Sequence, residues 1–476
     1  MESMKKHVVL FPWMGKSHLI PFAQLAQVIE RRKGYTVTIV NTPGNILTLR
    51  SFLPSSSTIH LVGLPFNPTD HGLNPGSEST DGLPNDHVLR FFQATETLRH
   101  SFDLFLSDTI ARSPPGSTLC IIADLFHWWT VETAKNLNVF HSNFSVTSAY
   151  GLGLLLSVVW DLPHTSADSD GYFSLPNHPN IRLHRSQIPK FLLSPDEHGP
   201  LIDCFRRQIP YCRASGGFLV NNAQAFEAAG IDVMRRELGI PVWTVGPLLR
   251  LPSTSFSDDS HWDWVRGWLG SHPPESVVYV SFGSMYTIST SQMVELAMGL
   301  EASEMAFIWM VRPPVGFDFN GEFRADEWLP EGFEERMREK KRGIVIRGWA
   351  PQPEILSHAS TGAFLSQCGW NSVLESLTNG VPIIGWPIES EQLINVKMLV
   401  EEKGVCVEVA RGNDSVVDRV HVEKTIKSVV GGGGKGEEMR RKAREIGKAL
   451  REAVEEGGDS IRAMDDFLHT ALSAKD

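Results

Sequence analysis

Short runs of β-branched and other apolar residues alternate with longer stretches of helical periodicity along the whole chain. Residues 7–11, His-Val-Val-Leu-Phe, predict a strand, and residues 18–32 repeat apolar side chains at helical spacing. In the first half we predict further strands at 35–40, 119–123, 217–220 and 242–245, and helices at 85–112 and 130–137. This alternation is typical of a parallel sheet covered by helices on both faces.

Between residues 247 and 260 the composition changes to Pro, Ser, Thr and Asp without periodicity, which indicates a linker. The alternation then restarts, and Ser289 with Gln292 predicts a capping box before a helix that runs through Leu300. In this half we predict strands at 277–282, 307–311, 343–346, 363–365, 381–384 and 405–409, and helices at 437–456 and 461–472. The second half therefore repeats the architecture of the first.

The length of the chain also favours two domains, because 476 residues exceed what one hydrophobic core usually serves. We expect two doubly wound α/β domains that face each other across a cleft, with ligands beyond the carboxyl ends of the strands. The predicted parts are a first domain at 1–246, a linker at 247–260, a second domain at 261–457 and a C-terminal helix at 458–476. We expect that helix to pack back on the first domain.

Composition narrows the possible partners and the compartment. The net charge of −11, from 44 basic and 55 acidic residues, argues against a nucleic-acid partner. The five scattered cysteines form no CxxC pair, so they indicate neither a disulfide framework nor a zinc site, and they fit a reducing compartment. The start lacks the apolar stretch of a signal peptide, and the longest apolar run, 149–160, is too short to cross a bilayer. We expect a cytoplasmic monomer without a membrane span.

Two short motifs suggest other chemistry, and in each case local structure explains them better. Residues 431–436, Gly-Gly-Gly-Gly-Lys-Gly, satisfy a dinucleotide-binding pattern but follow a helical stretch instead of a strand, so we predict a flexible surface loop. Asp168-Ser-Asp170 resembles a metal-binding DxD but lies in a cluster of turn residues that ends at Gly171. We therefore predict no metal site.

The stretch 349–392 reads WAPQPEILSHASTGAFLSQCGWNSVLESLTNGVPIIGWPIESEQ. It resembles the plant secondary product glycosyltransferase box of the UDP-sugar-dependent family 1 enzymes. Phe282-Gly-Ser284, Val245-Gly-Pro247 and an amino-terminal His followed by Leu-Ile-Pro extend the resemblance along the chain. It implies the GT-B fold of two Rossmann-like domains, with the acceptor on the first and the UDP-sugar on the second. It also implies a plant enzyme of secondary metabolism that needs no cofactor and no obligatory metal beyond its UDP-sugar co-substrate.

Within this segment, several residues suit a nucleoside. An indole such as Trp349, which follows a predicted strand, can stack on a planar base, and the family places this residue against uracil with the backbone of Ala350 and the side chain of Gln352 nearby. Glu375 lies four residues beyond Asn371 on the same helix face, where its carboxylate can accept hydrogen bonds from two ribose hydroxyls.

The strand at 363–365 leads through Gly369 into a helix predicted to begin around Asn371 and Ser372. Free backbone N–H groups and the dipole at a helix start suit a diphosphate. Ser284, after its own strand, adds a hydroxyl donor. Gln367 occupies the position of the family's histidine at the diphosphate; it can donate a hydrogen bond but cannot carry a charge.

Glu391 and Gln392 end the segment, and their adjacent carboxylate and amide suit several sugar hydroxyls, as the family uses them. A terminal glutamine together with Trp370 in place of an arginine resembles glucosyl donors more than galactosyl or glucuronosyl ones. The expected donor is UDP-glucose, and use of another UDP-sugar stays open.

The candidate catalytic pair is His18 and Asp124. A neutral imidazole can take the proton of an attacking hydroxyl, and a carboxylate on its far nitrogen fixes the tautomer and stabilises the imidazolium. Both residues follow central strands and match the family's catalytic His and Asp, which implies a single displacement with inversion. The family's glycine before the histidine is Ser17 here.

The acceptor is expected between loops of the first domain. Its candidate lining side chains are Trp13, Phe126, Trp128 and Tyr150, each equally compatible with core packing, and Thr147, with the Ser148 hydroxyl as the alternative. A small apolar acceptor such as a flavonoid, another phenolic or a terpenoid fits such a surface. C-glycosylation, a nucleotide-sugar-binding protein with weak or no catalysis and a nicotinamide-dependent dehydrogenase are the alternative functions.

Overall fold

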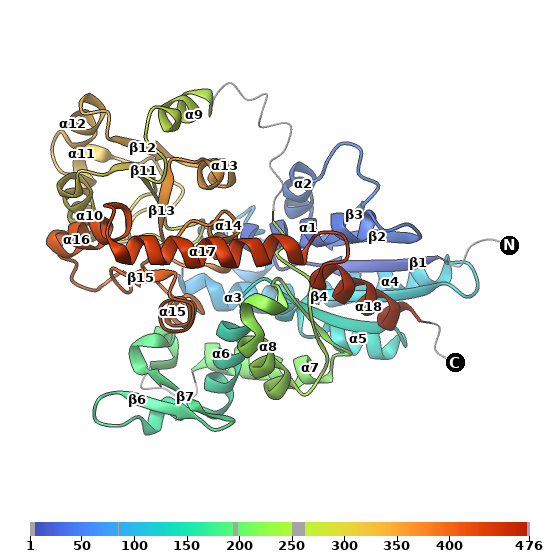
Figure 1. Ribbon diagram of the computed structural model, residues 1–476. Coiled ribbons are helices and arrows are strands. Elements are labelled where there is room, and N and C mark those ends of the chain that lie inside the picture. The colour runs from blue at the N-terminus through green and yellow to red at the C-terminus, as the bar shows by residue number, and fades with distance from the viewer. Residues whose placement is uncertain (1–4, 84, 194–198, 250–261, 474–476) are drawn as a thin grey trace. The chain divides into compact units, whose positions relative to one another are not determined.

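The computed structural model describes residues 5–83, 85–193, 199–249 and 262–473 (Figure 1). The chain divides into two compact units. Unit 1 comprises the described residues of 1–185, 190–249 and 453–476, and unit 2 those of 186–189 and 250–452. Most of the predicted linker, residues 250–260, lies outside the described residues.

Unit 1 is built on a seven-stranded parallel sheet in the order β3-β2-β1-β4-β5-β8-β9. Its strands are β1 (Lys6–Phe11), β2 (Tyr35–Asn41), β3 (His60–Gly63), β4 (Thr118–Asp124), β5 (Phe140–Ser145), β8 (Phe218–Val220) and β9 (Val242–Thr244). Its α-helices are α1 (Lys16–Glu30), α2 (Pro43–Phe52), α3 (Asn85–Thr95), α4 (Leu98–Ala111), α5 (Thr130–Asn136), α6 (Ala149–Asp161), α7 (Pro200–Ala214), α8 (Gln224–Leu238) and α18 (Asp459–Leu472). A hairpin of β6 (Tyr172–Leu175) and β7 (His178–His184) forms a separate antiparallel pair, and short 3₁₀ turns include η2 (Leu125–His127).

Strand β1 shows why this sheet is covered on both faces. Val8 and Leu10 belong to one apolar cluster, which includes side chains of α1 and α18, and Val9 and Phe11 belong to another, which includes side chains of α3 and α4. Alternate residues of a strand point to opposite faces, so a run of apolar residues needs cover on each side.

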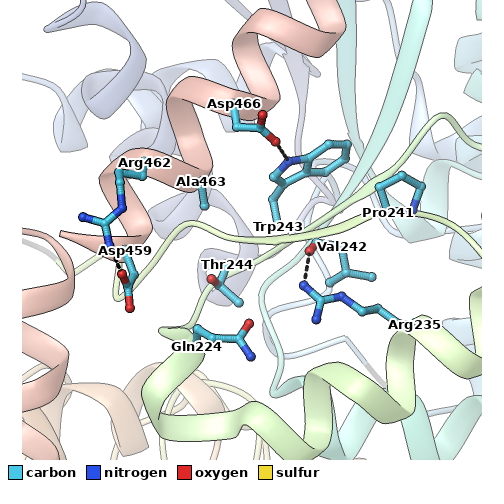
Figure 2. A pocket seen from close by; sticks show the side chains of 10 residues that line it. All are labelled: Gln224, Arg235, Pro241, Val242, Trp243, Thr244, Asp459, Arg462, Ala463 and Asp466. Atoms are coloured by element: carbon cyan, nitrogen blue, oxygen red, sulfur yellow. Dashed lines mark hydrogen bonds and ion pairs between the residues drawn. The ribbon is translucent and has the colours of Figure 1, made fainter. Parts of the chain in front are cut away.

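The C-terminal helix α18 packs on the sheet of unit 1. Met464, Phe467 and Leu468 are buried in the cluster that also contains Val8 and Leu10 of β1. The Trp243 indole of β9 donates a hydrogen bond to Asp466 at 2.7 Å (Figure 2). The last helix of the chain is therefore part of the amino-terminal core.

Unit 2 contains a six-stranded parallel sheet in the order β12-β11-β10-β13-β14-β15. Its strands are β10 (Val277–Ser281), β11 (Ala306–Val311), β12 (Gly343–Arg347), β13 (Thr361–Ser366), β14 (Ile383–Gly385) and β15 (Cys406–Glu408). Its helices are α9 (Asp263–Gly270), α10 (Thr290–Ser303), α11 (Ala325–Trp328), α12 (Phe333–Glu339), α13 (Gln352–Ser357), α14 (Trp370–Thr378), α15 (Gln392–Lys397), the π-helical turn η7 (Met398–Glu402), α16 (Arg419–Val430) and α17 (Gly434–Ala453). The prediction of two parallel α/β sheets is confirmed, as is the capping box of Ser289 and Gln292 at the start of α10.

Two predictions of local structure were wrong. The single helix at 85–112 is two helices, α3 and α4, because the hydroxyls of Thr95 and Thr97 bond back to the carbonyls of Phe92 and Ala94 and favour a turn between them. The predicted loop at 431–436 already enters α17 at Gly434. A side chain at Gly436 would collide with the Val429 carbonyl, so glycine permits this close approach of two helices.

Candidate functional site

His18 and Asp124 come together at the carboxyl end of the sheet in unit 1. Strands β1 and β4 are neighbours and pair Phe11 with Ala123, so the loop that leads from β1 to His18 in the first turn of α1 passes beside the end of β4. The His18 Nδ1–H donates to Asp124 Oδ2 at 2.6 Å. Because a carboxylate can only accept, the proton lies on Nδ1 and the lone pair of Nε2 points away from Asp124.

The carboxylate of Asp124 is fixed by a second bond. Its Oδ1 accepts the backbone N–H of Phe126 at 3.1 Å, which caps η2, and its side chain is only 1% exposed. The His18 side chain keeps 14% exposure, so the imidazole reaches solvent while its partner does not. A buried acceptor with a partly open imidazole is the arrangement that general-base chemistry requires.

Two of the predicted acceptor-site aromatics, Phe126 and Trp128, are partly exposed. The ring of Phe126 lies 5.8 Å from that of His18, centre to centre, and is partly exposed. Trp128 is also partly exposed and packs against Tyr211 at 4.5 Å.

The remaining acceptor candidates are more enclosed. Trp13 is 2% exposed and stacks on Phe92 at 4.6 Å, and Tyr150 is likewise 2% exposed, so core packing describes both side chains. Thr147 is partly exposed, and its hydroxyl shares a 2.9 Å hydrogen bond with Ser145.

In unit 2, two of the residues predicted for the nucleoside, Gln352 and Glu375, belong to one hydrogen-bond network. The Gln352 amide donates to Glu375 Oε2 at 2.6 Å and to Ser372 Oγ at 3.1 Å, and its oxygen accepts the Tyr279 hydroxyl at 3.3 Å. The loop after β12 places Trp349 beyond the strand end with 44% of its surface exposed, whereas Ala350 is buried.

The loop between β13 and α14 has an unusual backbone. Cys368 adopts a positive φ of 64°, which is strained for a residue with a side chain. Two hydrogen bonds hold this conformation: the Cys368 N–H donates to the Ser366 hydroxyl, and the Asn395 amide donates to the Cys368 carbonyl. Gln367 is 7% exposed, and its amide lies so close to Gly283 that a side chain there would collide with it. A Cβ on Gly369 would lie 3.1 Å from the same amide, so Gln367 sits between the loops that follow β10 and β13.

Helix α14 begins at Trp370, one residue earlier than predicted, with Gly369 as its N-cap in extended conformation. Trp370 and Ser372 are buried, and Asn371 and Ser284 are partly exposed. The first turn of this helix and the end of β10 therefore bring backbone N–H groups, a hydroxyl and amide groups to one edge of the sheet.

Glu391 and Gln392 lie at the start of α15. The Gln392 oxygen accepts the backbone N–H groups of Ile388 and Glu389 at 3.1 and 3.3 Å, and Glu391 accepts the Ser390 hydroxyl at 2.7 Å. These bonds orient the Gln392 amide so that its nitrogen is directed away from the loop backbone.

The sequence is similar to known glycosyltransferases over nearly its whole length. A profile of the family described as UDP-glucoronosyl and UDP-glucosyl transferase matches residues 264–439. UDP-glycosyltransferase 92A1 of Arabidopsis thaliana is 40% identical over 98% of this chain and 97% of its own length. Crocetin glucosyltransferase 3 of Crocus sativus is 42% identical over 89% of this chain and 90% of its own. The chain belongs to the plant UDP-glycosyltransferases of family 1.

Solved structures agree with this assignment. UGT73P12 of Glycyrrhiza uralensis, complexed with glycyrrhetinic acid 3-O-monoglucuronide, superposes with a TM-score of 0.83 and 29% identity, covering 98% of this chain and 96% of that one. The predicted GT-B fold and the predicted family are therefore confirmed. As a member of this family, the present chain uses a UDP-sugar donor and a small-molecule acceptor.

Sequence reasoning missed several residues that fix the loop before His18 in this glycosyltransferase. Asn41 and His127 both donate to the Pro12 carbonyl, and Asp81 accepts the Lys16 N–H at the first turn of α1. Asn41 and His127 come after the apolar residues of β2 and β4. A polar residue at the carboxyl end of a parallel strand often lies near a functional site, so the sequence could have indicated both residues. Asp81 lies in an irregular loop, and its contact depends on tertiary structure alone.

Other features of the glycosyltransferase contribute no predicted site residue. A cavity of about 650 Å³ lies where α8, β9 and α18 meet, and its two arginines are engaged, Arg235 with the Val242 carbonyl and Arg462 with Asp459 (Figure 2). Asp168 accepts the N–H groups of Asp170 and Tyr172, the turn chemistry that was predicted.

Within the described ranges, no group of three or more His, Cys, Asp or Glu side chains is placed to hold a metal ion, and no helix combines the length and hydropathy needed to cross a membrane.

Proposed function

We propose that this enzyme moves glucose from UDP-glucose to a hydroxyl of a small, largely apolar metabolite, with inversion, so that a β-glucoside forms. The observation that carries the proposal is the 2.6 Å hydrogen bond from His18 Nδ1 to the buried carboxylate of Asp124. It leaves Nε2 as a base of fixed tautomer at a partly exposed position.

In the proposed reaction, the acceptor hydroxyl gives its proton to His18 Nε2 as its oxygen attacks the anomeric carbon of glucose. The bond from that carbon to the β-phosphate oxygen breaks, and UDP leaves with the bonding electrons. The negative charge of Asp124 stabilises the imidazolium that forms. General-base help of this kind contributes roughly 10²–10⁴-fold to rate.

On the donor side, we assign the uracil to the exposed indole of Trp349 and the ribose hydroxyls to Glu375. The network from Gln352 to Glu375 and Ser372 supports this placement because it fixes the carboxylate beside the start of α14. The diphosphate is assigned to the N–H groups at that helix start, with the Gln367 amide and the Ser284 hydroxyl as further donors. These groups supply positive potential without a metal.

The sugar and the acceptor are assigned to two further groups of residues. We assign the glucose hydroxyls to Glu391, which accepts the Ser390 hydroxyl, and to Gln392, whose amide is oriented by the Ile388 and Glu389 backbone. Relatives are named for glucosyl transfer to crocetin and to flavonoids, which are consistent with an apolar acceptor here. Phe126 and Trp128 are the partly exposed aromatics best placed to contact it.

Mass spectrometry of products from UDP-glucose and a mixed library of phenols, terpenoid alcohols and other apolar hydroxyl compounds tests the proposal. A hexosylated product that NMR identifies as a β-O-glucoside is the expected result. Release of UDP without a glycosylated product, or a carbon-linked or α-linked product, would contradict it.

A further inference from the structure

His127 is a fully buried histidine in the turn that begins at Asp124. Its ring is 0% exposed and stacks on Phe11 of β1 with centres 4.0 Å apart. Its Nε2–H donates to the carbonyl of Pro12 at 3.2 Å, the first residue after β1. Burial lowers the pKa of His127 to about 4, so the ring is neutral near pH 7 and donates from Nε2 only.

The same carbonyl receives a second donor from the opposite side. Asn41, the last residue of β2, donates from Nδ2 to Pro12 O at 2.7 Å, and its side chain is 0% exposed. Its oxygen accepts the Thr42 N–H at 2.9 Å, which fixes the orientation of the amide. In sheet order β2 and β4 flank β1, so Asn41 reaches the Pro12 carbonyl from the end of β2 and His127 reaches it from the turn that follows β4.

We infer that His127 and Asn41 act as positioning residues, clamping the Pro12 carbonyl and so fixing the direction of the short loop that delivers His18 to Asp124. The loop spans only residues 12–15 before α1 begins, and Gly15, its N-cap, has no side chain to fix the helix start. Because Asp124 and His127 belong to one turn, the clamp ties the base and its carboxylate partner to the same rigid element. This inference rests on the proposed role of His18 as general base.

Packing alone does not explain a histidine at this position. The Nδ1 of His127 is buried without a hydrogen-bond partner among the described residues, which costs stability that phenylalanine would not. Phenylalanine would also keep the stacking on Phe11. The bond from Nε2 to Pro12 is what distinguishes histidine from phenylalanine here.

The test compares His127→Phe, which keeps the ring but loses the donor, with His127→Gln, which keeps a donor, in the full-length enzyme. Turnover is measured with two acceptors, an aliphatic alcohol found in the library screen and para-nitrophenol, which ionises with little help. We expect His127→Phe to lower kcat for the alcohol roughly tenfold, since small displacements of a catalytic group cost that much, while kcat for the phenol and UDP affinity stay near the parent's. His127→Gln should recover most of the loss.

His164→Phe is the matched control, because His164 is another buried histidine of unit 1 whose ring donates to a backbone carbonyl, that of Leu192 and not that of Pro12. It should affect both acceptors equally or not at all. Asn41→Ser is the second probe; its side chain is too short to reach Pro12, and it should reproduce the selective loss if His127→Phe folds poorly. Melting temperatures of all variants separate folding from positioning.

Parent-like alcohol turnover in folded His127→Phe and Asn41→Ser, or an equal loss on both acceptors, would overturn the inference. His18→Ala is measured in parallel, so that failure of the clamp can be told apart from failure of the proposed function. If His18→Ala is inactive on the alcohol while the clamp variants match the parent, only the clamp is wrong. If His18→Ala keeps parent turnover on the alcohol, the proposed function falls and the clamp falls with it.

Discussion

Replacing Asp124 with asparagine is expected to lower turnover on a weakly acidic alcohol by about 10²–10³-fold while the fold survives. The carboxylate has two hydrogen bonds, Oδ2 to the His18 Nδ1–H and Oδ1 to the Phe126 N–H, and both partners are donors. Asparagine offers one acceptor and one NH₂ group, so either orientation places a donor against a donor. If the NH₂ faces His18, the imidazole must move its proton to Nε2, where it can no longer take a proton from the acceptor.

The magnitude follows from the charge that is removed. The imidazolium formed during transfer and the carboxylate of Asp124 have charge centres about 4 Å apart, which corresponds to about 4 kcal/mol at an effective dielectric constant of 20. Each 1.36 kcal/mol of transition-state stabilisation is a factor of about ten in rate, and part of the interaction already exists with the neutral imidazole. The loss is therefore expected between two and three powers of ten, as a rough figure from the same relation.

The assay measures kcat with an aliphatic alcohol and, separately, UDP affinity by calorimetry. Asp103→Asn is the matched control, since this carboxylate of unit 1 accepts the Thr133 hydroxyl and has no bond to His18. UDP affinity should not change in either variant, because the proposed nucleotide contacts are all in unit 2. If Asp124→Asn turns over within about threefold of the parent, the Asp124 carboxylate does not stabilise the His18 imidazolium, and the prediction is wrong.

Three further predictions concern the donor site and stability. UDP-glucose should be preferred over UDP-galactose by roughly 5–150-fold in kcat/KM, because a misplaced hydroxyl opposite Glu391 and Gln392 costs about 1–3 kcal/mol; equal values in competition kinetics would contradict this. Gln367→Ala should lower kcat/KM for UDP-glucose and Gln367→His should be tolerated or mildly improving, whereas an unaffected, folded alanine variant would remove this residue from the diphosphate site. Hydrogen bonds and charge from Arg336, with help from Lys340, lower the pKa of Glu301 to about 2. Because the pKa is lower in the folded state, the ionised Glu301 stabilises the protein above about pH 4.5. Glu301→Gln should therefore lower the melting temperature at pH 7, by an amount worth at most about 1 kcal/mol after solvent screening, and the difference from the parent should shrink as pH falls from about 4.5 towards 2. A difference in melting temperature that persists at low pH would contradict this prediction.

The fold was predictable where periodicity was strong and local. The alternation of apolar strands and helices located all six strands of the second sheet and the capping box at Ser289, because these depend on neighbours in sequence. The break between α3 and α4 was missed, since the helical periodicity continues across it and only the hydroxyls of Thr95 and Thr97 favour the turn. Strand β5 was also missed, because His141, Ser142 and Asn143 interrupt its apolar pattern although the fold buries all three.

Some features of the candidate site could be predicted from the sequence and others could not. His18 and Asp124 could be paired from sequence because the carboxyl ends of adjacent parallel strands meet at one edge of a sheet. The burial of Trp13 and Tyr150 could not be predicted from the sequence, because an aromatic residue after a strand end can face either a pocket or the core. The clamp on Pro12 joins residues from β2 and η2 across the sheet, and no spacing along the chain encodes which carbonyl they will share.

The most direct test of the central claim, that His18 is the base in glucosyl transfer, is kcat for His18→Ala with UDP-glucose and a weakly acidic alcohol, measured beside UDP affinity. Alanine removes the imidazole that donates to Asp124 at 2.6 Å, and it leaves the residues of unit 2 untouched. We predict a loss of roughly 10²–10⁴-fold in kcat with nearly unchanged UDP affinity. Near-parent turnover on the alcohol would contradict it.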